Sequence, residues 1–123
     1  MAMISPDAEV ERVELAPAAA LFRSLGDPAR LMIVRRLAAG PARVTDLTAG
    51  LGLAQSTVSK HLSCLRDCGL VTSAPIGRAS VFRLAQPALA EMLSAAEAVL
   101  AATGNAVALC PVWGTDGCGG DEP

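Results

Sequence analysis

The sequence predicts a mainly α-helical domain that carries a β-hairpin. Apolar residues recur at helical spacing in several segments, and glycine or proline residues separate these segments. Between the last two of them, residues 70–85 alternate apolar and polar side chains on either side of a turn, which is typical of a hairpin. The 123 residues suffice for one compact domain with a modest core. Pairing two copies would hide more apolar surface, so we expect a homodimer.

The first two helices are predicted over residues 17–26 and 28–39. Gly26 ends the first helix, and Asp27 is a good N-cap for the second. Pro28 follows at the first helical position, where its missing N–H costs nothing. The inward-facing residues of the second helix are expected to be Leu31, Ile33, Val34 and Leu37.

Two further helices are predicted over residues 44–52 and 55–69, with a tight turn between them. The apolar stripe of the second consists of Val58, Leu62 and Leu65. A hairpin follows, with strands over 70–75 and 80–85. Two short helices joined by a tight turn and followed by a hairpin form a winged helix-turn-helix. The helix over 55–69 is therefore the expected recognition helix.

The last helix is predicted over residues 86–104. Its apolar stripe consists of Leu89, Leu93, Ala96 and Leu100. The residues after it are rich in glycine and proline, so we expect little regular structure there. The chain is therefore expected to have three parts: a mobile or short helical N-terminal arm over 1–15, a DNA-binding and dimerisation domain over 16–102, and a flexible C-terminal tail over 103–123.

Charge is distributed unevenly along the chain. The formal net charge is −2, but residues 16–84 hold nine basic groups against three acids, while both flanking segments are acidic. A basic middle segment suits a nucleic-acid surface. On charge alone, a solvated surface with acidic ends explains the pattern equally well.

Several classes of protein are not expected from this sequence. It has no apolar run of 18 or more residues, so we expect no membrane span, and the acidic N-terminus does not resemble a signal peptide. We therefore expect a cytoplasmic protein, whose four cysteines should mostly be reduced thiols. The single histidine, with no nucleophile–base pair and no phosphate-binding glycine loop, gives no indication of an enzyme.

Short polar side chains gather at the start of the predicted recognition helix. Hydroxyl and amide groups there could bond to base edges or phosphates in a major groove, and an arginine at the hairpin tip could reach a phosphate or the minor groove. The candidate DNA-binding residues are Gln55, Ser56, Thr57, Ser59, Lys60, His61 and Arg78. The alternative is that one of the serines only caps the helix and its neighbours are solvated.

Three segments of this chain carry a resemblance to a known family. They are LFRSLGDPARLMIVRRLAAG, VTDLTAGLGLAQSTVSKHLSCLRDCGLV and IGRASVFRLA. Together they resemble the ArsR/SmtB family of bacterial metal-responsive repressors over about residues 17–102. The resemblance implies a homodimer that binds double-stranded operator DNA and leaves it when an inducer binds. It also implies a dimer interface formed by the first and last helices.

The family places inducer sites at several locations, and this sequence retains only some of the residues. One site uses cysteines at the start of the helix before the turn, where this chain reads RVTDL. Another uses Asp and His on the last helix, which has no histidine here. Cys64 and Cys68 on the recognition helix, with Cys110 in the tail, resemble the CmtR branch of cadmium- and lead-sensing repressors. That branch completes the helix pair with a tail cysteine from the other subunit.

The chemistry of these cysteines agrees with the resemblance. Residues i and i+4 of a helix lie about 5–6 Å apart at Cβ, so two thiolates can share one soft ion. A third sulfur from Cys110 would make a site suited to Cd(II), Pb(II) or As(III), and a fourth from Cys118 would favour Cd(II) or Zn(II). The alternatives are that Cys64 and Cys68 are small buried hydrophobes, that the thiols sense oxidation, or that the repressor senses nothing.

Overall fold

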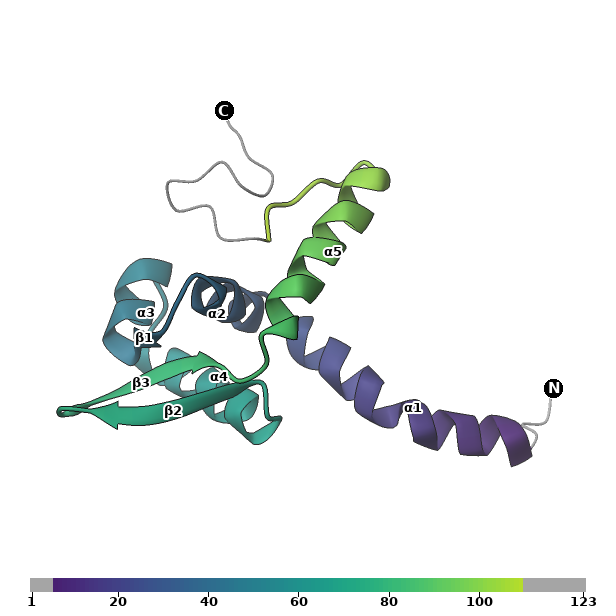
Figure 1. Ribbon diagram of the computed structural model, residues 1–123, viewed down its shortest axis with the longest axis horizontal. Helices are drawn as coiled ribbons and strands as arrows, with labels where there is room; N and C mark the ends of the chain where they lie inside the picture. Colours follow the sequence, from purple (N-terminus) through teal and green to yellow (C-terminus); the bar gives the residue numbers. More distant parts are fainter. Residues whose placement is uncertain (1–5, 110–123) are drawn as a thin grey trace.

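The computed structural model describes residues 6–109 and is mainly helical, with a small antiparallel sheet (Figure 1). The predicted fold class, mainly α with a β-hairpin wing, is confirmed. The elements are α1 (Pro6–Leu25), α2 (Pro28–Ala38), β1 (Ala42–Arg43), α3 (Val44–Leu51), α4 (Gln55–Asp67), β2 (Val71–Ile76), β3 (Ala79–Leu84) and α5 (Ala88–Ala102).

Helix α1 is longer than the sequence pattern indicates. It runs unbroken through the point where we expected an arm over 1–15 to meet the domain, and it extends away from the other helices (Figure 1). Acidic Asp7 and Glu9 in its first turn and Arg23 in its last turn complement the helix dipole. With the alanines between them, these charges favour the helix, which agrees with the helical form of the expected arm. Most of the helix is exposed, including the apolar residues Val10, Val13, Leu15 and Phe22.

Helix α2 begins as the sequence predicts. The Asp27 carboxylate accepts a hydrogen bond from the backbone N–H of Arg30 at 3.0 Å, and Pro28 occupies the first turn. Ile33, Val34 and Leu37 are buried as expected. Leu31 is only partly buried, because it lies beside an open groove between α1 and α5.

The core lies where α2, α3 and α4 meet the sheet. Gly52 ends α3 with a left-handed backbone, at φ 69°, and so turns the chain into α4. The α4 stripe of Val58, Leu62 and Leu65 is buried as predicted. The other large buried residues of this core include Ile33, Leu47, Val71 and Phe82.

The wing is a hairpin of β2 and β3, extended by a short third strand. The strand order is β1-β3-β2, with all pairs antiparallel. Val71 pairs with Leu84 at the base of the hairpin, and Ile76 pairs with Ala79 next to the turn at Gly77. Strand β1 was not predicted, because two residues are too few to show an alternating pattern.

The segment after α5 folds back onto the body, although it has no regular structure through residue 109. Leu109 is only 6% exposed, and its backbone N–H donates to the Glu97 carboxylate. The Arg35 guanidinium donates to the Ala108 carbonyl at 3.0 Å. The start of the predicted tail is therefore docked against α2 and α5. The predictions for Cys110 and Cys118 lie outside the described residues.

Candidate nucleic-acid interface and thiol site

The first half of α4 presents a polar face. Burial of its apolar stripe turns the opposite side of the helix outward, where Gln55, Ser56, Ser59 and Lys60 are exposed and Thr57 is partly exposed. The N-cap position is Ala54, and no side chain caps the first turn. The alternative in which a serine serves only as the N-cap is therefore wrong.

The hairpin adds positive charge next to this helix. Strand β2 contacts α4, and Arg78 is exposed beside Gly77 at the tip. Residues 55–84 contain four basic side chains and one acid. Basic groups in such a position attract the DNA backbone independently of sequence. Helix α4 and the hairpin therefore form one basic, largely polar surface.

His61 does not share that surface. Its side chain is 16% exposed, and its Nε2 lies 3.7 Å from an oxygen of Asp27. Its buried Nδ1 has no hydrogen-bond partner among residues 6–109. We predicted a DNA contact for this residue, but the side chain turns instead toward the corner between α1 and α2. It follows the exposed Lys60 by one helical position, a rotation of about 100°, which carries it off the outer face.

Cys64 and Cys68 are exposed free thiols. Cys64 lies within α4, and Cys68 is its C-cap, with its N–H donating to the Cys64 carbonyl at 3.0 Å. The alternative that both are small buried hydrophobes is therefore wrong. The Cys68 sulfur lies 3.6 Å from the hydroxyl oxygen of Ser24 in the last turn of α1.

The α1–α2 corner that faces these residues is tied together by several polar contacts. The Arg30 side chain donates to the Ser24 carbonyl at 2.7 Å. The hydrogen bond from the Arg30 backbone lowers the pKa of Asp27 below its ordinary value, and the charges of His61 and Arg30 lower it further. The corner therefore has a defined geometry on the side that meets α4.

The described residues do not by themselves form a metal site. Within residues 6–109, no group of three or more histidine, cysteine, aspartate or glutamate side chains is assembled so that it could hold an ion. Cys64 and Cys68 provide two sulfurs on one face of α4. A soft-metal site of three or four ligands needs at least one further donor.

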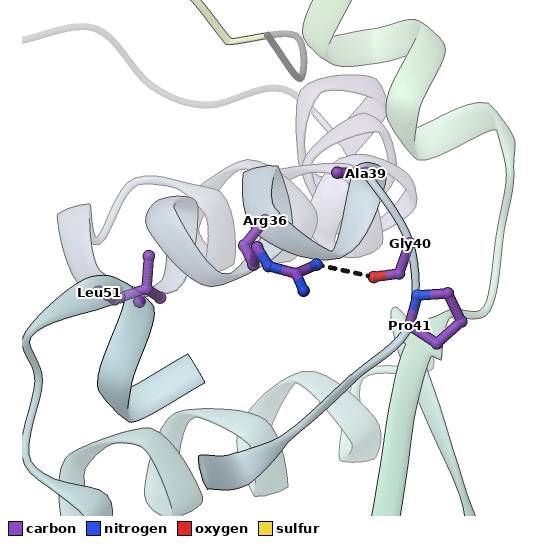
Figure 2. Close-up of a pocket in the computed structure, with 6 residues that line it drawn as sticks. Arg36, Ala39, Gly40, Pro41 and Leu51 are labelled. Carbon is purple, nitrogen blue, oxygen red and sulfur yellow. Dashed lines mark hydrogen bonds between the residues drawn. The ribbon is translucent and has the colours of Figure 1, made fainter. Parts of the chain in front are cut away.

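A cleft elsewhere in the domain has no such chemistry. Figure 2 shows it at the end of α2, where the Arg36 side chain donates to the Gly40 carbonyl at 3.1 Å. The remaining lining residues are Ala39, Pro41, Gly50 and Leu51. None of these is a thiol, imidazole or carboxylate. The arginine stabilises the loop that leads into β1, and the cleft is not a candidate sensing site.

Comparison with known proteins shows to which family the chain belongs. A family model described as bacterial regulatory protein, arsR family, matches residues 27–73, from the N-cap of α2 into β2. Over 91 residues the chain is 38% identical to the HTH-type transcriptional regulator NmtR of Mycobacterium tuberculosis, which covers 74% of this chain and 76% of NmtR. The chain belongs to the ArsR family. The resemblance expected from the sequence is confirmed.

Two further known proteins resemble this protein. The HTH-type transcriptional regulator CmtR of Mycobacterium tuberculosis is 47% identical over 75 residues, which is 61% of this chain and 64% of CmtR. An NMR structure of CmtR, described as a cadmium metal-sensor, matches with 45% identity and a TM-score of 0.55, covering 63% of this chain and 80% of that one. The homodimeric winged helix-turn-helix domain of Mb0332 from Mycobacterium bovis matches with a TM-score of 0.69 and 25% identity, covering 84% and 93%.

These relatives define the class of this ArsR-family protein. They are transcriptional regulators that share its helix-turn-helix, so it is a winged helix-turn-helix DNA-binding regulator and not an enzyme. In residues 6–109, no helix has the length and apolar character needed to cross a membrane.

Proposed function

We propose that this protein is a metal-responsive transcriptional repressor, which binds operator DNA as a homodimer and releases it when a thiophilic metal ion binds. One observation carries the proposal. The helix that presents polar side chains for DNA also carries two exposed thiols on its second half. An ion held by those thiols would act directly on the DNA-reading element. Binding to chromosomal DNA would make this a cytoplasmic activity.

In the proposed complex, α4 enters the major groove and the hairpin contacts the flanking backbone. The side chains assigned to DNA are Gln55, Ser56, Thr57, Ser59, Lys60 and Arg78. Their exposure and the basic charge of the surface support this assignment. His61 is left out because it faces Asp27.

The proposed dimer interface lies on α1 and α5. An apolar groove of about 590 Å³ runs between these helices and α2. Phe22 on α1 and Val99 on α5 line it, and both are more than 60% exposed in the single chain. Large exposed apolar patches mark association surfaces. A second copy of the chain is the proposed occupant, by analogy with the homodimeric Mb0332 domain.

The proposed inducer is Cd(II) or Pb(II), held by Cys64, Cys68 and Cys110. Three thiolates suit these ions, and the relative CmtR is described as a cadmium metal-sensor. As(III) could use the same three sulfurs, and a fourth from Cys118 would favour Cd(II) or Zn(II). Leu109, the residue before Cys110 in the sequence, is docked in the apolar groove at the proposed interface. This supports a third sulfur given across the dimer.

The test is a metal titration of the protein on DNA selected by the protein from a random pool. Cd(II), Pb(II), Zn(II) and As(III) are compared by DNA release and by thiolate-to-metal ultraviolet absorption. We expect Cd(II) or Pb(II) to weaken DNA binding about 5- to 150-fold, the usual range of allosteric coupling. Release by peroxide, with no response to any metal, would instead identify a thiol redox repressor.

A further inference from the structure

The contact between Ser24 and Cys68 joins two elements that are distant in the sequence. Ser24 is in the last turn of α1 and Cys68 caps α4, and their side-chain oxygen and sulfur lie 3.6 Å apart. This distance is within the range of a hydrogen bond to sulfur. Cys68 therefore faces α1 rather than open solvent on that side.

The position of Ser24 is fixed by its own surroundings. Its carbonyl accepts a hydrogen bond from the Arg30 side chain at 2.7 Å, and the Arg30 backbone N–H donates to the Asp27 carboxylate that caps α2. The same corner makes a second contact with α4, in which the Asp27 carboxylate lies beside the His61 side chain. His61 and Cys68 lie on one face of α4 with Cys64 between them, at spacings of three and four residues. The corner thus contacts this face on both sides of Cys64.

A hydroxyl at this position has a definite chemical use. Cys68 stands at the C-terminal end of α4, where the backbone carbonyls carry partial negative charge. A donated O–H offsets this charge and fixes the direction of the sulfur, as partners of metal ligands commonly do. The spacing also fits. Two sulfurs bound to one tetrahedral zinc ion, with bonds of about 2.3 Å, lie about 3.8 Å apart. The oxygen–sulfur distance between Ser24 and Cys68 is close to this value, so the Ser24 side chain lies where a second ligand of a thiophilic ion on Cys68 would lie.

We propose that Ser24 is a positioning residue of the thiol site, which donates a hydrogen bond to the Cys68 sulfur and so makes α1 part of the metal-sensing apparatus. This inference rests on the proposed function. Because α1 also lines the apolar groove, an ion on Cys68 would act on the proposed dimer interface through Ser24 as well as on α4.

The first test measures cadmium affinity by competition with a chromophoric chelator, using the full chain. We expect Ser24→Ala to weaken Cd(II) binding about 10- to 100-fold, as loss of one hydrogen bond to a charged metal ligand would. Ser24→Thr keeps the hydroxyl and should stay within about twofold of the unmodified protein. Ser63→Ala, which removes an exposed hydroxyl from α4, is the matched control and should have no effect. Equal affinities for Ser24→Ala and the unmodified protein would overturn the proposal.

A metal-free measurement separates this proposal from the proposed function. The rate of alkylation of Cys68 is compared with that of Cys64 in the same molecules by peptide mass spectrometry. We expect Ser24→Ala to change the Cys68:Cys64 ratio about two- to fivefold, because Cys68 loses its hydrogen-bond partner while the surroundings of Cys64 stay the same. An unchanged ratio would reject the Ser24 contact. If the unmodified protein binds no metal, the proposed function fails, whereas this ratio still tests Ser24.

A gain-of-ligand variant tests the geometry. In a Cys110→Ser background, Ser24→Cys would place a sulfur beside Cys68 at about the spacing that one ion requires. We expect this change, studied under reducing conditions, to raise Cd(II) affinity at least about tenfold above Cys110→Ser alone. No gain in affinity would mean that α1 does not hold Ser24 against the thiol site in solution.

Discussion

Asp27 illustrates how one residue serves both local structure and the site. Its carboxylate caps α2 and also lies beside His61 of α4. The capping role was predictable, because Asp followed by Pro ahead of an apolar periodic run is a helix-start pattern. The contact with His61 was not, because it joins residues 34 positions apart in the sequence and depends on how α4 packs against α2.

Asp27→Asn should destabilise the protein in a pH-dependent way. Asparagine can still cap the helix, but it lacks the negative charge that the Arg30 hydrogen bond and the charges of His61 and Arg30 stabilise. Because the pKa of Asp27 is lowered below its ordinary value of 3.8, its carboxylate contributes stability above that pH. The contribution is lost as the pH falls through the lower folded value.

Urea unfolding at neutral pH and near pH 3 tests this expectation. At neutral pH the free energy of unfolding should be lower for Asp27→Asn than for the unmodified protein. The gap between the two proteins should narrow on acidification. A gap that stays constant or widens at low pH would show that the charge of Asp27 contributes no stability.

Ser24 and the thiols show where prediction at the residue level ends. The helical spacing of Cys64 and Cys68 indicated a shared face, which the structure confirms as exposed. No pattern identified Ser24, because a serine near the end of a helix is common and its partner is 44 residues away. His61 was assigned to DNA from its place next to Lys60, and only the packed structure reveals that it faces Asp27.

At the level of elements, the two glycines near the end of α3 should respond oppositely to the same substitution. Gly52 has φ 69°, so Gly52→Ala should lower the free energy of unfolding by about 1 kcal/mol. Gly50 lies within α3, and an added Cβ there meets nothing within 4 Å. Gly50→Ala should therefore raise the free energy of unfolding by roughly 0.5 kcal/mol.

Thermal or urea unfolding measures both changes, and each variant is the control for the other. Similar effects of both substitutions would contradict the assigned end of α3. Gly52 also sets the direction in which α4 leaves the turn, so Gly52→Ala should weaken DNA binding more than Gly50→Ala does.

Long periodic elements were predictable, whereas short or unpatterned ones were not. The helices α2 to α5 and the hairpin follow from apolar spacing and from glycine and proline positions. Strand β1 has two residues and shows no period. The docking of Leu109 depends on a groove built by three helices, so no local pattern could indicate it. The extension of α1 to Pro6 reflects helix propensity and charge rather than an apolar stripe.

At the scale of the whole molecule, Phe22 tests the proposed dimer. It is 64% exposed in the single chain, so Phe22→Asp should hardly affect folding of the protomer. It should dissociate the dimer, because a charge would be buried in an apolar interface. Ile76→Asp is the matched control, since Ile76 is 57% exposed on the wing and away from the groove.

Sedimentation measures the state of association of these two variants. Phe22→Asp should sediment as a monomer and bind selected DNA more weakly, because two recognition helices no longer act together. Ile76→Asp should remain dimeric. A dimeric Phe22→Asp protein would place the interface elsewhere on the molecule.

The central claim is that the helix that reads DNA also holds the inducing ion. The most direct test adds Cd(II) to the protein on its selected DNA, reading DNA anisotropy and thiolate-to-cadmium absorption in the same sample. The account predicts that both signals change together at the same metal ratio. Both should be lost in Cys64→Ser and in Cys68→Ser, while Ser63→Ala behaves normally. Normal DNA release by Cd(II) from the two cysteine variants would contradict it.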